Sequence, residues 1–136
     1  SVVVTRPFLE SIGLMCEEYF LYFEEIDWAE RGRGAFDVGV CLRSLVFHRG
    51  AASIGSPREP GERGVRSEYF LLRSRLLFAR RFFRRRLPVV YGGLVISIVN
   101  RLVRGRWRRA RVALCALLGV RPAMAGLPEK LIGERT

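Results

Sequence analysis

The hydrophobic pattern of the first half predicts short strands alternating with helices. The apolar run SVVVT at residues 1–5 predicts a buried strand. The segment PFLESIG at residues 7–13 predicts a short helix with proline in its first turn and glycine at its end. Residues 19–34, YFLYFEEIDWAERGRG, predict a second helix with an aromatic first part that also suits an extended chain. Apolar and polar side chains alternate in residues 35–48, AFDVGVCLRSLVFH, which predicts one or two strands.

The pattern changes to helical spacing after a loop. Residues 49–64 are rich in glycine, serine and proline, which predicts a loop or linker. Residues 67–86 predict a long helix that is interrupted at Leu87-Pro88, and residues 105–119 predict an amphipathic helix before an irregular end. The apolar positions at helical spacing are Tyr69, Leu72, Leu76 and Phe83 in the first helix, and Trp107, Ala110, Leu114, Leu117 and Leu118 in the second.

One apolar run raises the question of a membrane. Residues 89–99, VVYGGLVISIV, form a run of eleven residues before polar Asn100 and Arg101. A spanning helix needs about 20 apolar residues, so the run is short for a transmembrane segment. The sequence therefore predicts that this part of the chain binds at a membrane surface rather than crossing it.

Composition narrows the class of protein. With 136 residues, of which 49% are hydrophobic, the chain can bury the core of one ordinary domain. The start, SVVVTRPFLESIG, suggests a fragment or a processed piece, and it has no pattern of a secretory signal. The three cysteines, Cys16, Cys41 and Cys115, are isolated from one another, which favours reduced thiols in the cytoplasm.

The net charge of +11 is distributed unevenly. Residues 1–62 contain ten acids and six arginines, whereas residues 63–136 contain eighteen bases and three acids. A mildly acidic first part is thus joined to a strongly basic second part. This asymmetry indicates a polyanionic partner for the second part, either nucleic acid or anionic lipid.

Two groups of residues are candidates for chemistry. Glu24, Glu25 and Asp27 lie within four positions, and on a helix Glu24 and Asp27 share a face. They are either a solvated first helical turn or, beside so many aromatic rings, proton acceptors at the edge of an apolar wall. His48, the single histidine, is either a packed or surface residue or a ligand of a divalent metal.

The order of these parts resembles a known family. Residues 14–55 contain the aromatic phrase YFLYF, the acidic pair and Asp27, the arginine-bearing WAERGRG, the phrase AFDVGVCL, His48 and the small-residue loop RGAASIG. In order and spacing this resembles the C-terminal part of the catalytic domain of family 2 glycosyltransferases of the rhamnosyltransferase-like kind. The resemblance covers about residues 2–55, and EYFLLRSRLLFARRF is similar to the helix that follows that domain.

The resemblance implies a fold and a reaction. The expected fold class is α/β: residues 1–62 as the C-terminal part of a GT-A nucleotide-sugar fold, followed by a basic, mainly helical tail at residues 63–136. The expected activity is inverting transfer from a nucleotide-sugar donor to a saccharide or lipid-linked acceptor in cell-envelope polysaccharide synthesis. The Asp-x-Asp motif of the donor side lies far upstream in the family and has no match here. The chain alone is therefore expected to be inactive.

The resemblance also implies roles for individual residues. Glu25 corresponds to the general base, at a position where the family often has aspartate. Glu24 and Asp27 would shape the acceptor site, with Tyr22 and Trp28 among the rings that form its wall. His48 would complete the coordination of a divalent cation, Mg²⁺ or Mn²⁺, on the sugar diphosphate.

The basic part has two competing interpretations besides that of solvated arginines on packed helices. In the first, Phe82, Phe83, Trp107 and the apolar run enter the interface of an anionic membrane, with arginines on lipid phosphates. This fits a cytoplasmic enzyme bound peripherally to the inner face of the cell membrane. In the alternative, the chain is a non-enzymatic arginine-rich module that binds nucleic acid or anionic membrane. The membrane is favoured over nucleic acid, because the apolar residues are too continuous for a groove-binding helix and no base-reading motif is present.

Overall fold

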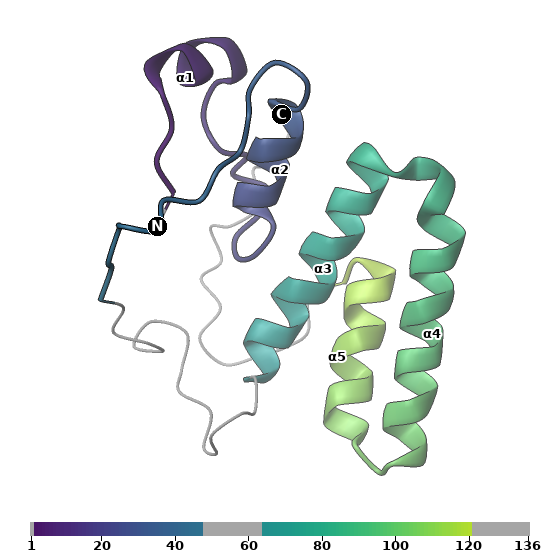
Figure 1. Cartoon of the computed structure of the whole chain (residues 1–136). Coiled ribbons are helices and arrows are strands. Elements are labelled where there is room, and N and C mark those ends of the chain that lie inside the picture. The colour runs from purple at the N-terminus through teal and green to yellow at the C-terminus, as the bar shows by residue number, and fades with distance from the viewer. Residues whose placement is uncertain (1, 48–63, 121–136) are drawn as a thin grey trace, which may run out of the picture.

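The computed structural model describes residues 2–47 and 64–120, and every regular element within these ranges is a helix. The two short helices of the first part of the chain lie beside the three longer helices of the second part (Figure 1). A single 3₁₀ turn, η1 (Arg84–Arg86), precedes the fourth α-helix. The α-helices are α1 (Arg6–Ile12), α2 (Glu24–Arg31), α3 (Val65–Phe82), α4 (Leu87–Val103) and α5 (Trp107–Leu118).

The α/β prediction, and with it the expectation of a GT-A fragment, is wrong for the described residues. Residues 2–5 and 35–47, predicted as strands, run without regular structure, and a turn at Cys41–Ser44 interrupts the second segment. Their apolar side chains are exposed, with Val3 and Leu42 each 93% accessible. Alternating hydrophobicity gives a segment the side chains of a strand, but a strand also needs a partner for its backbone hydrogen bonds. No such partner lies within the described ranges.

Helix α1 follows the sequence prediction. The backbone N–H of Phe8 donates to the Thr5 hydroxyl at 3.4 Å, which caps the helix, and Pro7 occupies the first turn. Gly13 ends the helix with a φ of +76°, which is costly for residues with a Cβ. These local signals place both ends of the helix.

Helix α2 is half as long as the predicted segment. Tyr22 and Phe23 have φ values of 68° and 72°, so the chain turns sharply there and the helix begins only at Glu24. Helix α2 ends at Gly32, where α1 approaches closely. A Cβ at this position would lie 2.5 Å from a ring carbon of Phe8, so the contact between α1 and α2 requires glycine.

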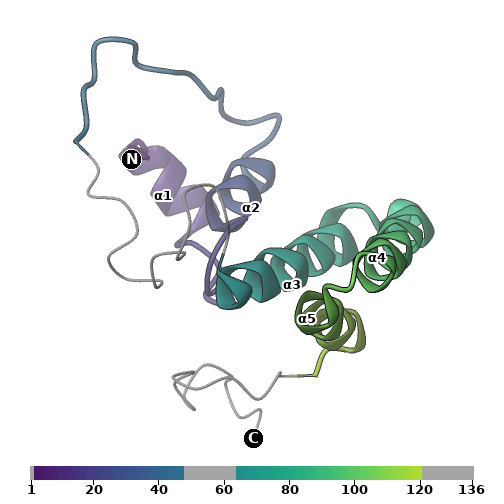
Figure 2. The same cartoon turned by 90° about the horizontal axis from the view of Figure 1, so that it is seen from below.

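The core lies among α3, α4 and α5, and α5 packs against both of the other helices (Figures 1 and 2). Tyr69, Leu72 and Leu76 on α3 are buried there, as predicted. The chain interrupts α3 at Phe83 rather than at Pro88, and proline takes a place in the first turn of α4, where it is tolerated. The buried residues of this cluster are Tyr69, Phe70, Leu72, Leu76, Leu94, Val112, Ala113 and Ala116.

The first part of the chain is attached to α3 by residues 14–23. The rings of Phe20 and Phe70 have centroids 4.6 Å apart, and those of Phe23 and Phe78 are 5.4 Å apart. The hydroxyl of buried Ser74 donates to the Leu21 carbonyl oxygen at 2.9 Å. The aromatic phrase that precedes α2 thus contacts α3. The boundary predicted at residue 62 lies outside the described ranges.

Candidate functional site

A pocket of about 800 Å³ lies beside α1 and α2, between the two extended segments. Residues 2–5, residues 36–41, Ser44 and Val46 line it, and Phe8, Glu25, Trp28 and Ala29 contribute from the helices. This volume is within the range of small-molecule sites, about 300–1,000 Å³. The pocket therefore brings together two of the residues predicted from the sequence, Glu25 and Trp28.

Trp28 is held firmly in the pocket wall. Its indole Nε1 donates to the Gly13 carbonyl oxygen at 2.8 Å, and its ring meets the Phe8 ring edge-on, with centroids 5.3 Å apart. Phe8 in turn contacts Phe36 edge-on, with centroids 5.1 Å apart. These contacts fix the orientation of the aromatic wall before any ligand arrives, which lowers the entropic cost of binding.

Glu25 offers a free carboxylate at the pocket. It lies in the first turn of α2 on the exposed side of the helix, where the helix dipole favours negative charge. Among the described residues, no side chain or backbone group forms a hydrogen bond or ion pair with it. A carboxylate that is free and faces a pocket can accept a proton from a bound hydroxyl group.

Two other predicted acceptor residues lie away from the pocket. The hydroxyl of Tyr22 and the hydroxyl of Ser67 on α3 form a hydrogen bond of 2.5 Å, so this ring joins the two parts of the chain. Glu24 is partly buried and is not among the lining residues. The structure thus separates Tyr22 and Glu24 from the Glu25 carboxylate.

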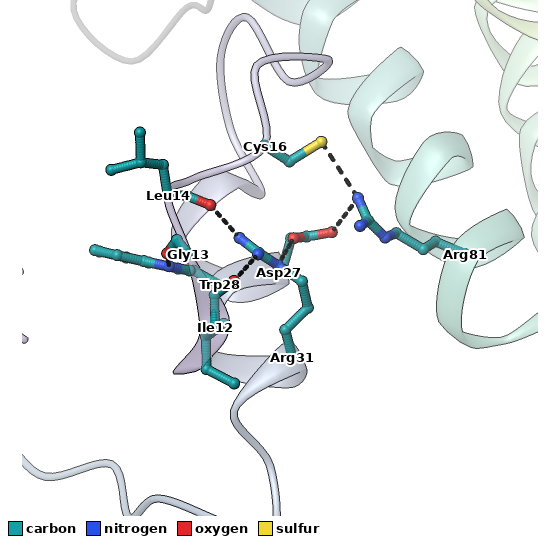
Figure 3. A network of polar contacts seen from close by, with 8 residues as sticks. All are labelled: Ile12, Gly13, Leu14, Cys16, Asp27, Trp28, Arg31 and Arg81. Atoms are coloured by element: carbon teal, nitrogen blue, oxygen red, sulfur yellow. Dashed lines mark hydrogen bonds and ion pairs between the residues drawn. The ribbon is translucent and has the colours of Figure 1, made fainter. Parts of the chain in front are cut away.

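Asp27 is the centre of a buried ionic network (Figure 3). Its side chain is completely inaccessible. Arg31 Nε donates a hydrogen bond to Asp27 Oδ2 at 2.9 Å, and Arg81 Nη1 forms an ion pair with Asp27 Oδ1 at 3.2 Å. The other two nitrogens of Arg31 donate to the carbonyl oxygens of Ile12 and Leu14, each at 2.7 Å. Asp27 thereby connects α2 both to the end of α1 and to α3.

This network was not anticipated from the sequence. One signal could have revealed part of it, because Asp27 and Arg31 are four residues apart and face each other on a helix. The contact with Arg81, which also donates to Cys16 Sγ at 3.2 Å, joins residues 54 or more positions apart. Only the packing of residues 14–23 on α3 brings these groups together.

Tyr19 makes the network sensitive to alkaline pH. Burial raises the pKa of its phenol well above the ordinary value of 10.0, and the neighbouring Asp27 carboxylate adds to this effect. The folded state therefore favours the neutral phenol. Its contribution to stability is complete below pH 10 and is lost progressively as the pH rises above that value.

We expect this dependence to disappear in a Tyr19→Phe variant. Urea unfolding followed between about pH 9 and 11 should show a smaller loss of stability for the variant than for the wild type. Tyr91→Phe on α4 is the control, because Arg80 donates to the Tyr91 hydroxyl at an exposed site. Equal pH slopes for the wild type and Tyr19→Phe would contradict this role of Tyr19.

The predicted metal ligand, His48, lies outside the described residues. Within residues 2–47 and 64–120, no three histidine, cysteine, aspartate or glutamate side chains are grouped as a metal site would require. The divalent metal, Mg²⁺ or Mn²⁺, stays a prediction that rests on His48. The chemistry below is therefore assigned to Glu25 and the pocket alone.

The site that emerges is small and local. Glu25 and Trp28 face one pocket, Asp27 stabilises the helix that carries them, and Tyr22 and Glu24 are placed elsewhere. No protein-family model, no curated protein and no solved structure shows a significant match to this chain.

Proposed function

We propose that the pocket binds the acceptor saccharide of a glycosyltransferase and that Glu25 is the general base of the transfer. The observation that carries the proposal is the placement of the Glu25 carboxylate, which pairs with no group of residues 2–47 and 64–120, beside the fixed Trp28 ring in one pocket. Sugars are bound by this combination, since their C–H faces contact rings and their hydroxyl groups donate to carboxylates. Family 2 glycosyltransferases, which residues 14–55 resemble in the order of their motifs, carry out this reaction, although the described residues do not have the α/β fold of that family.

The reaction assigned to Glu25 is a single displacement. The acceptor hydroxyl oxygen forms a bond to the anomeric carbon of the donor while its proton passes to the Glu25 carboxylate. The bond from the anomeric carbon to the diphosphate breaks, and the nucleoside diphosphate leaves with the electron pair. Attack from the side opposite the leaving group inverts the configuration of the sugar.

The described residues supply only the acceptor side of this reaction. The nucleotide-sugar donor requires a second binding site, whose Asp-x-Asp motif has no match in the 136 residues. We therefore propose that donor-binding sequence outside these residues completes the enzyme. The acceptor would be a saccharide or lipid-linked saccharide of the cell envelope. The rival function, a non-enzymatic arginine-rich module, requires no saccharide in the pocket.

Saccharide binding to the chain itself tests the proposal. In a Trp107→Phe background Trp28 is the remaining tryptophan, so its fluorescence should change saturably on addition of an oligosaccharide prepared from bacterial envelope polysaccharide. Val40→Arg should weaken this binding by about tenfold or more, because Val40 lines the pocket and a long charged side chain there would obstruct the saccharide. Both residues altered in this test are exposed, which limits the effect on folding.

Leu42→Arg is the matched control for Val40→Arg. Leu42 lies two residues away, is equally exposed and is not among the pocket residues, so the same substitution should leave binding unchanged. An equal loss in both variants would assign the effect to added charge rather than to the pocket. The absence of a saturable fluorescence change with any envelope oligosaccharide would favour the non-enzymatic module.

A further inference from the structure

Helix α4 has an apolar face that the rest of the described chain leaves uncovered. Ile96 and Val103 on this face are 71% and 81% accessible. At 100° per residue, its members fall within a sector of about 80°, so they form one continuous stripe along the helix. We call this stripe the outer face of α4; it consists of Val89, Gly92, Ile96, Val99 and Val103.

The opposite side of α4 accounts for its packing. Leu94 is buried in the core, and Val90, Tyr91 and Ile98 pack against the same cluster. Arg84–Val103 is also the one stretch of the described residues that is long and apolar enough to cross a membrane by length and composition, and Leu94 is the buried residue of α4. Helix α4 is therefore apolar on two sides. The side with Leu94 packs against α3 and α5, and the outer face packs against neither.

Positive charge surrounds the outer face. Residues 64–120 contain fourteen arginines and one acid, Glu68. That acid is buried between α3 and its neighbours, where it contacts Arg101 Nη2 at 2.5 Å and Arg109 Nη1 at 3.8 Å. Exposed arginines lie next to both ends of α4. They are Arg84, Arg85 and Arg86 before the helix and Arg104, Arg106 and Arg108 after it.

We propose that the outer face of α4 binds the surface of an anionic lipid bilayer, with the helix lying parallel to the membrane plane. Val89, Ile96, Val99 and Val103 would enter the boundary between headgroups and acyl chains. The arginines at both ends of α4 would contact lipid phosphates, whose negative charge attracts them. In this orientation the apolar side chains leave water while the arginines at the ends of α4 contact negative lipid headgroups.

Charge argues against a second copy of the chain on this face. Two copies paired through the outer face would bring their terminal arginines, such as Arg86 and Arg104, to the same interface. No exposed carboxylate in residues 64–120 could compensate them, because Glu68 is already buried and paired. Negative lipid headgroups compensate the charge of these arginines, whereas a second copy adds further positive charge at the same place.

The neighbouring helices argue against a spanning orientation. Helix α5 packs along α4 and carries exposed Arg108 and Arg111. If α4 crossed the bilayer, these guanidinium groups would enter the hydrocarbon, which is costly.

The structure changes which aromatic residues take part. Phe82 and Phe83, expected in the interface from the sequence, are half-buried and contact Phe78 with ring centroids 5.0 Å and 5.7 Å away. Trp107 is 68% exposed at the start of α5, directly after the turn that follows α4. Trp107 is therefore placed to report on the membrane, whereas the two phenylalanines are occupied in packing.

Vesicle co-sedimentation of the whole chain tests the proposal. We expect binding to vesicles of phosphatidylcholine with phosphatidylglycerol, weaker binding at high salt, and little binding to phosphatidylcholine alone. The double variant Ile96→Asp/Val99→Asp should lose at least about tenfold in affinity, since it removes inserted apolar surface. The matched control is Leu42→Asp/Leu45→Asp, which makes the same charge change at two exposed leucines outside α4 and should bind more than the α4 variant.

A second measurement reports on depth. In a Trp28→Phe variant, brominated acyl chains should quench Trp107, and the quenching should be lost in the Ile96→Asp/Val99→Asp variant. Equal binding of the two double variants, or equal binding to neutral and anionic vesicles, would overturn the proposal. Resistance to carbonate extraction would indicate a spanning helix instead. Failure to bind vesicles, with a shift from dimer to monomer in the α4 variant or with tight binding to RNA, would assign the face to another partner.

Discussion

Replacing Asp27 with alanine should destabilise the folded chain by about 2–3 kcal/mol. The carboxylate is completely buried, and it joins Arg31 on α2 with Arg81 on α3. Loss of one partner of a buried ion pair typically costs about 3–5 kcal/mol, because the remaining charge is buried without compensation. The expected cost is lower here because the side chain of Arg81 is 41% accessible and its guanidinium can turn towards water.

Urea unfolding measures this effect, with Glu10→Ala as the control. Glu10 forms a surface pair with Arg6 at 3.6 Å, with both side chains largely exposed, and its removal should change stability by less than about 0.5 kcal/mol. If Asp27→Ala changes stability little but abolishes saccharide binding, Asp27 is a residue of the acceptor site, as the sequence suggested. A large loss of stability identifies Asp27 as the residue that holds α2 in place.

The helices were predictable where their determinants are local. Thr5, Pro7 and Gly13 act within one turn of α1, and the apolar spacing of Tyr69, Leu72 and Leu76 identifies the inner side of α3. Such signals depend on neighbours three or four residues away, which the sequence displays directly. The predicted strands at residues 2–5 and 35–47 depended on partners remote in the chain, which alternation of side chains cannot supply.

The orientation of α5 illustrates a second limit. The sequence placed Trp107, Ala110, Leu114, Leu117 and Leu118 at helical spacing on one apolar side, yet Trp107, Leu114 and Leu118 are exposed. Of that set, Ala110 is buried and Leu117 packs against the core, and the other buried residues of α5 are Val112, Ala113 and Ala116. Small side chains let α5 approach α3 and α4 closely, and this requirement of helix packing is not visible in hydrophobicity alone.

The acidic cluster separates for a similar reason. On α2, Glu25 and Asp27 point to different sides of the helix, and the contacts of α1 and α3 decide which side becomes interior. Glu25 and Trp28 line the same pocket, because both belong to the same short helix. The sequence could not show that Arg81 forms an ion pair with Asp27, because the two residues are 54 positions apart in the chain.

In the enzyme formed with its donor-binding sequence, Glu25→Gln should lower the rate of sugar transfer by about 10²–10⁴-fold. Glutamine keeps the size of the side chain but cannot take the proton of the acceptor hydroxyl. Because the change leaves the nucleotide-sugar site untouched, the turnover number should fall while the KM for the donor stays nearly constant. Release of nucleoside diphosphate, measured at saturating donor and acceptor, gives the rate.

Two further variants locate the base. Glu10→Gln on α1 makes the same substitution at an exposed site away from the pocket and should transfer sugar at the wild-type rate. Glu24→Gln should have an effect of no more than a few-fold, because Glu24 lies in the same turn as Glu25 but does not line the pocket. If Glu24→Gln abolishes transfer and Glu25→Gln does not, the base is Glu24. In that case the pocket beside Trp28 is not the acceptor site.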